Sequence, residues 1–390
     1  MQNFVYHNPT KVIFGKGCIS QIGTEAKNFG NKALFVYDEN AAKKSGVYDQ
    51  IVRSLKEAGI AFVEFTQIRE NPVIADARKG IELARKEKIE FIVAAGGGSA
   101  IDEAKAIAAG LCVAHDVWDF FCGKAVMKTA MPVLAVITKS ATGTETNGGS
   151  VMMNEETSEK VGLILPPLFP KIAFMDPSVT RSLPNIQLAY GAVDAISHLL
   201  EGYLTNDDPE TPTVDEYAEG LIRSIVSSTE QLLENPDHDN ARATFMWSAA
   251  LAWNGLVLAG IGKCGYPNHL IGHAMSALYG TQHGASISVS FSGWMPYFIA
   301  ESAANARKMS QFGKAVFAIN GQDTTKSAEA TVMAFRNWCK KIGAPTTLKE
   351  IGIDDTGLHR VAENASLGAE GWGIPQYTKE RISHILSRCE

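Results

Sequence analysis

The first half of the chain alternates short apolar runs with helical patterns, and this alternation limits the possible folds more than any other feature. Continuous apolar strands joined by helices of about 10–15 residues are typical of a parallel, doubly wound sheet with helices on both faces. We therefore predict an α/β nucleotide-binding fold of the Rossmann-like kind for this half. The apolar runs that we assign to strands are residues 12–15, 32–38, 61–65, 90–95 and 131–138.

The pattern changes after about Pro184, where β-branched runs become scarce and long helical periodicities follow one another. We predict two domains, an α/β domain over residues 1–183 and an all-helical domain over residues 184–390, with SLPNIQ as the boundary. The most apolar run covers residues 249–262, is too short to span a membrane and is predicted to form one buried helix.

Composition excludes several classes of partner. The formal net charge of −6 provides no basic footprint for nucleic acid. Six cysteines occur without any CxxC pair, so neither a zinc ribbon nor a disulfide framework is expected. Reduced thiols and an N-terminus without a signal-peptide pattern predict a cytoplasmic protein with no membrane partner.

Three of the nine histidines lie close together in the stretch NHLIGHAMSALYGTQHG. His269 and His273 are four residues apart and share one helix face. His283 lies fourteen residues after His269, roughly 21 Å along a straight helix. Two ligands at about 2.0–2.1 Å from one ion lie no more than roughly 4 Å apart, so a shared metal requires a helix break, expected at Gly280. Alternatively, these are ordinary hydrogen-bonded histidines.

A second candidate pair is Asp194 and His198, which lie at i and i+4 in the otherwise apolar segment YGAVDAISHLLEG. A carboxylate buried on an apolar face needs a partner, which a metal or a plain Asp–His hydrogen bond supplies. Together the two clusters offer one oxygen and several nitrogen ligands, a set that suits Fe, Zn, Ni or Co. The spacing of HLIGH is that of a metalloprotease motif, but Leu270 replaces the required glutamate.

The glycine-rich turn Gly96-Gly97-Gly98-Ser99 lies between a predicted strand and a predicted helix. Glycines allow close approach of a ligand, and a helix N-terminus offers N–H groups to a phosphate. A second small-residue loop, KSATGTETNGG over residues 139–149, follows the next strand. Two such loops at neighbouring strand ends predict a nucleotide site. The alternative is a tight turn without a ligand.

These motifs together resemble the iron-containing, or group III, alcohol dehydrogenase family, in particular its butanol dehydrogenase-like branch. The resemblance covers nearly the whole chain and includes FVYHNPTKVIFGKG, GGGSAIDEAKAIA and ATGTETN. It implies a dehydroquinate synthase-like fold and a homodimer built partly on residues 4–14, which we expect to form an edge strand. It also implies four metal ligands and a histidine beside the nicotinamide, which is the candidate catalytic residue His273; the ligands are Asp194, His198, His269 and His283.

The implied activity is hydride transfer between a nicotinamide and a small primary alcohol or aldehyde such as butanol, assisted by one divalent metal, Fe or Zn. The implied cofactor-binding residues are Asp38, Gly97, Gly98, Ser99, Thr138, Thr142, Asn147 and Lys160. Many butanol dehydrogenase-like members carry a glycine-rich turn suited to NADP after the first nucleotide strand. Here that turn reads Tyr37-Asp38-Glu39-Asn40, and the Asp38 carboxylate predicts NAD, although the nearby Lys43 and Lys44 leave NADP open.

Three alternatives remain at this point. Glycerol or propanediol dehydrogenases and dehydroquinate synthase-like lyases share the scaffold, but a phosphorylated substrate would need a cluster of Lys and Arg facing the metal. Around the histidines the sequence instead offers Phe245, Trp247, Trp253 and Leu256, which favours a small apolar substrate. A non-catalytic nucleotide- or metal-binding protein is the third alternative.

Overall fold

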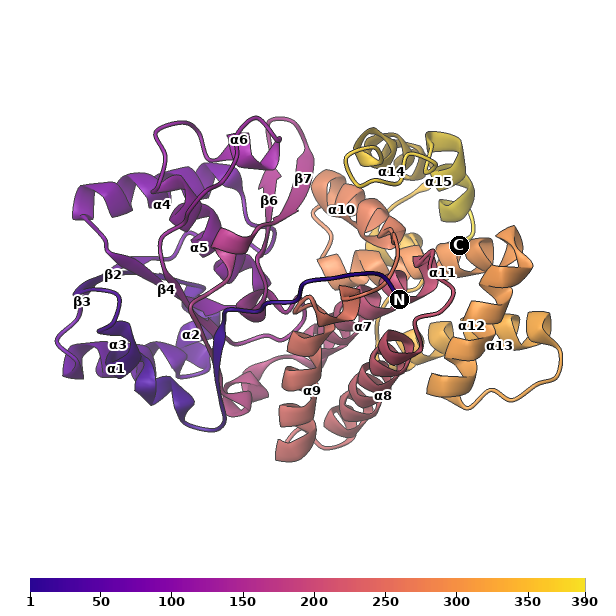
Figure 1. Ribbon diagram of the computed structural model, residues 1–390, viewed down its shortest axis with the longest axis horizontal. Coiled ribbons are helices and arrows are strands. Elements are labelled where there is room, and N and C mark those ends of the chain that lie inside the picture. Colours follow the sequence, from indigo (N-terminus) through magenta and orange to yellow (C-terminus); the bar gives the residue numbers. More distant parts are fainter. Residues whose placement is uncertain (390) are drawn as a thin grey trace. The chain divides into compact units, whose positions relative to one another are not determined.

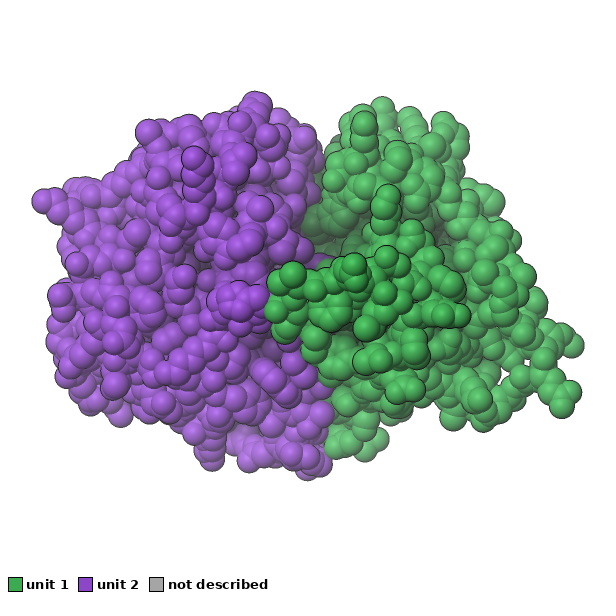
Figure 2. Space-filling model, viewed as in Figure 1, with its two compact units in different colours: residues 1–6, 185–234, 255–390 green, residues 7–184, 235–254 purple. Residues whose placement is uncertain are grey.

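The structure is a computed structural model that describes residues 1–389. The chain divides into two compact units, each drawn in its own colour in Figure 2. The first, here called the α/β unit, comprises His7–Pro184 and Asn235–Asn254. The second, here called the helical unit, comprises Met1–Tyr6, Asn185–Glu234 and Gly255–Glu390.

The α/β unit is built on a six-stranded sheet with the order β1-β8-β5-β4-β2-β3, in which every neighbouring pair is parallel. Helices pack on this sheet, as the indigo and purple part of Figure 1 shows. The predicted doubly wound α/β fold is confirmed. The strands of this sheet are β1 Lys11–Phe14, β2 Lys32–Tyr37, β3 Ala61–Phe65, β4 Phe91–Gly96, β5 Val133–Ile137 and β8 Ile172–Met175.

Alternate residues of the strands belong to two separate hydrophobic cores, one on each face of the sheet. Leu34 and Val36 belong to the core on the side of α4 (Ile74–Glu87) and α5 (Gly98–Gly110). Phe35 and Tyr37 belong to the core on the side of α1 (Ile22–Ala26) and α3 (Val47–Glu57). Because successive side chains of a strand point to opposite faces, strands covered on both sides must be apolar throughout, as the sequence indicated.

Strand order changes direction between β2 and β4. The chain runs from β2 outward to the edge strand β3 and then returns to place β4 on the other side of β2. In doubly wound sheets, ligands bind at the carboxyl ends of the strands at such a switch point. Asp38 follows β2 and the glycine-rich turn follows β4, so both lie at this position.

The second nucleotide loop is tied to α5 by a buried lysine. Lys105 is 0% exposed, and its Nζ lies 2.7–2.9 Å from Thr144 O, Thr144 Oγ1, Asn147 O and Gly149 O. Asp102, one turn earlier, accepts from Thr144 Oγ1 at 2.6 Å and from the Val151 backbone at 3.0 Å. Burial lowers the pKa of Lys105 to about 8, against the opposing effect of Asp102. This pair of charges fixes the loop to the helix.

The loop leads into an antiparallel hairpin that the sequence analysis did not predict. Its strands are β6 (Gly149–Asn154) and β7 (Glu159–Ile164), which form a separate two-stranded sheet. The remaining helices of the α/β unit are α2 Glu39–Lys44, α6 Trp118–Phe121 and α9 Asp239–Ala252.

The helical unit contains no strand among its described residues, in agreement with the predicted all-helical fold. No helix within residues 1–389 is long and apolar enough to cross a lipid bilayer. The helices of this unit are α7 Asn185–Thr205, α8 Pro212–Glu234, α10 Pro267–Tyr279, α11 His283–Glu301, α12 Ala303–Phe317, α13 Thr324–Lys341, α14 Asp355–Gly368 and α15 Lys379–Leu386.

The helix break required by the histidine spacing occurs where it was predicted. Helix α10 ends at Gly280, which has φ 64° in the left-handed region and donates its N–H to Ser276 O at 3.0 Å. Glycine adopts this conformation without a Cβ penalty. The next helix, α11, begins at His283, so His269 and His283 lie on two helices that pack together.

Two expectations from the sequence are wrong. Residues 4–14 do not form one edge strand, because only Lys11–Phe14 is β structure. The apolar run 249–262 is not one helix, because α9 ends at Ala252 and Gly255 adopts φ 93° before a 3₁₀ turn at Leu256–Leu258. Turn-forming Asn254 and Gly255 outweigh the hydrophobicity of the run.

The division into domains over residues 1–183 and 184–390 stays a prediction. The main boundary falls between Pro184 and Asn185, but contacts group Asn235–Asn254 with the α/β unit and Met1–Tyr6 with the helical unit. Helix α9 packs against the 3₁₀ segment Pro177–Ser182 and against the second loop.

Replacing Gly280 by Ala is expected to destabilise the protein by about 1 kcal/mol, because a Cβ is strained in the left-handed region even where space is open. Gly220, within α8, is the control. A Cβ there meets Arg223 at an ordinary 3.6 Å, and Ala favours the helix. Gly220→Ala should therefore raise the thermal unfolding midpoint while Gly280→Ala lowers it. Equal midpoints for the two variants would contradict this explanation of the break.

Replacing Lys105 by Met is expected to destabilise the protein by roughly 3 kcal/mol or more, because it leaves Asp102 and four oxygens buried without their cation. The exposed Lys86 of α4 is the control, and Lys86→Met should change stability by less than about 0.5 kcal/mol. Urea unfolding midpoints measure the difference. A Lys105→Met variant as stable as the Lys86 variant would show that the loop does not depend on the ammonium.

Candidate metal centre and nucleotide loops

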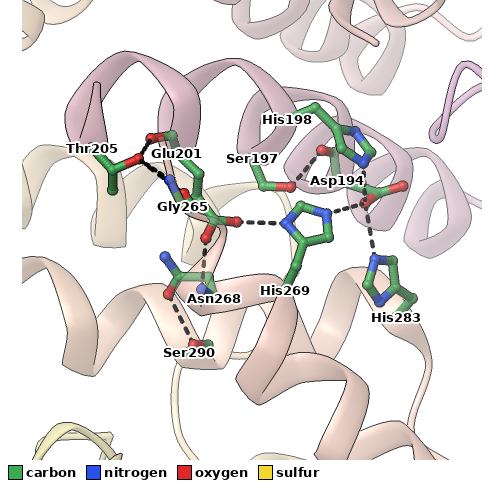
Figure 3. Close-up of polar contacts among 10 residues, drawn as sticks. All are labelled: Asp194, Ser197, His198, Glu201, Thr205, Gly265, Asn268, His269, His283 and Ser290. Atoms are coloured by element: carbon green, nitrogen blue, oxygen red, sulfur yellow. Dashed lines mark hydrogen bonds and ion pairs between the residues drawn. The ribbon is translucent and has the colours of Figure 1, made fainter. Parts of the chain in front are cut away.

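Three imidazole rings converge on one carboxylate oxygen in the helical unit. The Nε2 atoms of His283, His269 and His198 lie 3.3, 3.8 and 3.9 Å from Asp194 Oδ1. Figure 3 shows the three rings turned toward the aspartate from α7, α10 and the start of α11. Two ligands bound to one ion at about 2.0–2.1 Å lie no more than roughly 4 Å apart, so all three distances fit a common ion.

The burial of Asp194 supports the same conclusion. Asp194 is 2% exposed, and no group within residues 1–389 donates a hydrogen bond to its Oδ1. A buried carboxylate oxygen without a donor is costly unless a cation compensates it. The ligand atoms of Asp194, His198 and His269 all lie within 4.8 Å of one another. These three residues therefore fit a divalent metal with one oxygen and two nitrogen ligands; His283, whose Nε2 lies 3.3 Å from Asp194 Oδ1, is outside this group and is the candidate fourth ligand.

The two histidine-bearing helices approach α7 closely. A Cβ on Gly284, directly after His283, would lie 2.3 Å from Tyr190 O of α7, so only glycine allows this approach. Gly272 of α10 likewise faces Ile287 of α11, where a Cβ would lie 2.9 Å from Cδ1. Close packing of these helices brings three separate segments to one point. The side chain of His283 is 22% exposed, whereas those of the other two histidines are 8% exposed.

His273 lies one turn after His269 and beside the centre. Its ring centroid is 5.3 Å from that of His283 and 6.4 Å from that of His269. Trp372 packs edge-on against it, with a centroid distance of 5.0 Å. Tyr266 packs edge-on against His269 at 5.7 Å. The immediate surroundings of the histidines therefore include two large aromatic rings.

Burial changes the protonation of the site. It lowers the pKa of His198 to about 4, while Asp194 acts in the opposite direction and His269 in the same direction. The imidazole is thus neutral at physiological pH, which is the form that binds metals.

The sequence analysis missed one residue of the centre, Glu201. It lies on α7 seven residues after Asp194, is 0% exposed and contacts His269 Nδ1 through Oε1 at 2.5 Å. Burial raises the pKa of Glu201 above its ordinary value, while hydrogen bonds from Asn268 and His269 act in the opposite direction and favour the carboxylate. Its position on the same helix face as Asp194 and His198, at i and i+7, was the available signal.

The glycine-rich turn follows β4 and opens α5. No side chain caps α5, whose N-cap residue is Gly97. A Cβ on Gly98 would lie 2.9 Å from Thr142 Oγ1, so the turn and the second loop are in close contact. An uncapped N-terminus of a 13-residue helix offers N–H groups and a positive dipole end to a phosphate.

The candidate residues of the second loop are mainly engaged in shaping it. Thr138 donates its backbone N–H to Gly96 O at 2.9 Å and thereby joins the two strand ends. Thr142 Oγ1 accepts from the Thr144 N–H at 3.3 Å. Asn147 donates to Thr142 O at 3.2 Å and accepts from the Gly149 N–H at 2.7 Å. The structure therefore brings these residues together beside the glycine-rich turn.

Ser99 and Lys160 both contact the segment after β3. The Ser99 hydroxyl donates to Glu70 O, and Lys160 Nζ donates to Asn71 Oδ1 at 2.9 Å. The two candidate cofactor residues thus lie near consecutive residues of one segment. Their roles toward a nucleotide remain a prediction.

Asp38 is the N-cap of α2. Its Oδ1 accepts from the Ala41 N–H at 2.9 Å, so the side chain caps this helix. Its backbone N–H donates to Ala95 O at 3.4 Å, so Asp38 lies directly beside the glycine-rich turn. Lys43 is paired with Glu39 at 2.6 Å and lies over the Tyr48 ring.

Two of the aromatic residues used to predict an apolar substrate serve other purposes. Trp247 packs edge-on against Phe14 at 6.0 Å, and Phe245 is 5% exposed; both belong to the α/β unit. Trp372 and Tyr266 are the aromatic rings beside the histidines, and the sequence analysis named neither.

Two family models match consecutive parts of the chain. Residues 9–177 match the family described as iron-containing alcohol dehydrogenase, and residues 188–389 match the C-terminal part of the Fe-containing alcohol dehydrogenase family. The two matches cover the nucleotide loops and the histidine cluster, respectively.

Individual relatives match over almost the full length. The chain is 34% identical to the probable NADH-dependent butanol dehydrogenase 1 of Bacillus subtilis, with 99% of each chain covered. It is 32% identical to the NADPH-dependent aldehyde reductase YqhD of Escherichia coli, covering 92% of this chain and 91% of that protein. The crystal structure of NADH-dependent butanol dehydrogenase A from Thermotoga maritima superimposes with a TM-score of 0.94 at 42% identity, covering 100% of this chain and 99% of that one. The chain therefore belongs to the iron-containing alcohol dehydrogenase family of oxidoreductases.

Proposed function

We propose that this enzyme interconverts small primary alcohols, such as butanol, and their aldehydes with NAD(H) as the hydride carrier. The observation that carries the proposal is the convergence of three imidazole Nε2 atoms on the buried Asp194 Oδ1. The names of the relatives at 32–42% identity support an alcohol or aldehyde substrate. Trp372 and Tyr266 beside the histidines favour a small, uncharged substrate over a phosphorylated one.

In this proposal Asp194, His198, His269 and His283 hold one divalent metal, iron or zinc, with nickel and cobalt as further candidates. When bound, the metal polarises the substrate oxygen and the nicotinamide carries the hydride. His273 takes up or delivers the alcohol proton on a ring nitrogen. Trp372 packs edge-on against that ring and restricts its orientation.

The α/β unit binds the cofactor in this proposal. The uncapped N-terminus of α5 receives the pyrophosphate, with Gly97 and Gly98 allowing its close approach. Thr138, Thr142 and Asn147 shape the neighbouring loop, and Ser99 and Lys160 lie beside the segment after β3. Asp38 at the end of β2 accepts hydrogen bonds from the adenosine ribose.

An absorbance assay of NADH with butyraldehyde, and of NAD with butanol, tests the function directly. Protein loaded with iron or zinc should oxidise NADH in the presence of butyraldehyde, and a chelator should abolish the activity. Protein that binds NADH and metal but turns over neither substrate would instead support the non-catalytic alternative.

His283→Ala is expected to reduce bound metal and turnover strongly, because it removes one of four ligands from a partly exposed position. His273→Ala should retain the metal and lose turnover, because His273 is assigned to proton transfer. Elemental analysis of freshly purified protein, together with kcat, measures both effects. Full metal content and full activity in His283→Ala would contradict the ligand assignment.

NADH is expected to be used at least about tenfold more efficiently than NADPH. Like charges about 4 Å apart at an effective dielectric near 20 repel by roughly 4 kcal/mol, and half of that already exceeds a factor of ten. Since Lys43 is paired with Glu39, it offsets little of the repulsion between Asp38 and a 2′-phosphate.

The ratio of kcat/KM for the two cofactors measures this preference. Asp38→Gly should shift the ratio toward NADPH. Asp38→Asn is the matched control, since asparagine keeps the helix cap but removes the charge. A similar shift in this variant would assign the preference to the charge and not to the cap. Equal use of both cofactors by the unmodified enzyme would contradict the role of Asp38.

We also propose a homodimer in which β1 of each copy lies at the two-fold interface. β1 is an edge strand, and exposed strand edges are usually paired or covered. Phe14 at its end is 42% exposed and packs on Trp247, which is 40% exposed, so a large aromatic pair lies at the surface of the α/β unit.

Light scattering is expected to give twice the 42.0 kDa chain mass at micromolar concentration. A charge introduced by Phe14→Asp should shift the protein toward monomer, whereas Leu367→Asp, on the exposed surface of α14, should not. A monomeric unmodified protein would refute the dimer.

We propose that the protein is located in the cytoplasm. All six cysteines are unpaired thiols, which supports a location in this reducing compartment.

A further inference from the structure

Glu201 is a fully buried acid in direct contact with a candidate metal ligand. It lies on α7, close to one turn after His198. In Figure 3 its carboxylate meets the His269 ring on the side opposite Asp194. Oε1 lies 2.5 Å from Nδ1, while Nε2 of the same ring lies 3.8 Å from Asp194 Oδ1. His269 is therefore held between two carboxylates.

The second oxygen of Glu201 fixes the helix that carries His269. Oε2 accepts from the Asn268 backbone N–H at 2.6 Å. Asn268 and His269 are consecutive residues in the first turn of α10, so one carboxylate positions both the backbone and the ring. Asn268 in turn accepts from Ser290 Oγ of α11 at 2.8 Å, which extends the contacts to the helix of His283.

The chemistry of imidazole determines which atom donates the hydrogen bond between His269 and Glu201. A neutral imidazole that binds a metal through Nε2 carries its proton on Nδ1. That N–H then donates to Glu201 Oε1, and the Nε2 lone pair faces Asp194. A carboxylate that accepts from the second nitrogen of a histidine ligand fixes the tautomer and raises the basicity of the ligand.

We propose that Glu201 is the positioning residue of the metal centre, holding His269 in the tautomer and orientation that bind the ion. The inference rests on the proposed metal site. It assigns Glu201 no contact with substrate or cofactor. Its effect is on metal affinity and on the geometry of the bound ion.

Substitution by glutamine tests this role sharply, because both groups that contact the carboxylate must donate. Glutamine keeps only one acceptor oxygen. If its amide nitrogen faces His269, it donates to Nδ1 and moves the ring proton to Nε2, the ligand atom. If it faces the Asn268 N–H, two donors meet and the start of α10 is displaced. Either arrangement weakens His269 as a ligand.

Glu219 provides a matched control in the same unit. It is 8% exposed, lies on α8 and accepts from Tyr203 Oη at 2.8 Å and from Gln311 at 3.1 Å. Among the described residues, its hydrogen bonds go to these two side chains and to none of the four candidate ligands. Glu219→Gln is therefore the same chemical change at another buried acid.

The experiment uses full-length protein stripped of metal and titrated with Co²⁺ or Zn²⁺ against a chromophoric chelator. The visible spectrum of the Co²⁺ form reports the ligand geometry, and thermal unfolding of the metal-free form reports stability. Glu201→Gln should bind metal about 10–100-fold more weakly and change the Co²⁺ spectrum. Glu201→Asp, which keeps two acceptor oxygens but is one methylene shorter, should lie between Glu201→Gln and the unmodified protein, and it replaces Glu201→Gln if that variant does not fold. Glu219→Gln should match the unmodified protein.

Asp194→Asn separates the inference from the metal site itself. If Asp194→Asn loses metal while Glu201→Gln keeps full affinity and an unchanged Co²⁺ spectrum, the positioning role is overturned and the site stands. The same follows if Glu201→Gln lowers only the thermal midpoint of the metal-free form. If Asp194→Asn binds metal like the unmodified protein, the site and the inference both fail.

Discussion

The candidate site of the helical unit depends on one carboxylate oxygen that is buried without a hydrogen-bond donor. Asp194 Oδ1 lies on an apolar face of α7, and three imidazole nitrogens face it within 4 Å. In a low-dielectric interior such an oxygen needs a cation to compensate its charge. In the proposed metal site a divalent ion would compensate this charge and use the three nitrogens as ligands. The helices that carry these groups, α7, α10 and α11, pack against one another.

Chain geometry then dictates where the backbone must turn. His269 and His283 reach the same oxygen only because α10 stops at Gly280 and α11 starts three residues later. Gly284 allows α11 to begin against the backbone of Tyr190. In the α/β unit a different constraint acts, since Lys105 and Asp102 hold the second loop against α5 from within the protein. In both units buried charges position the segments that carry the candidate site.

Much of the fold was predictable because its signals are local. Strands covered on both faces are apolar throughout, and residues 33–37 and 91–95 show this directly. Glycine and histidine spacing also required the break at Gly280. The hairpin β6–β7 was not predicted because its residues alternate between buried and partly buried. This pattern is neither a continuous apolar run nor a helical periodicity, the two patterns used to assign strands and helices. The prediction of one helix over residues 249–262 was wrong because Asn254 and Gly255 form a turn in spite of the hydrophobicity of the run. Glu201 lay on the right helix face, but its partner depends on where α10 begins, which no local pattern specifies.

The proposed metal centre consists of one ion bound by one carboxylate and three imidazoles. X-ray absorption at the metal edge of protein loaded with one equivalent of Zn²⁺ or Co²⁺ measures that ligand set directly. We expect scattering from three imidazole rings and from oxygen at about 2.0–2.1 Å. A sulfur ligand near 2.3 Å, or fewer than three imidazoles, would contradict it.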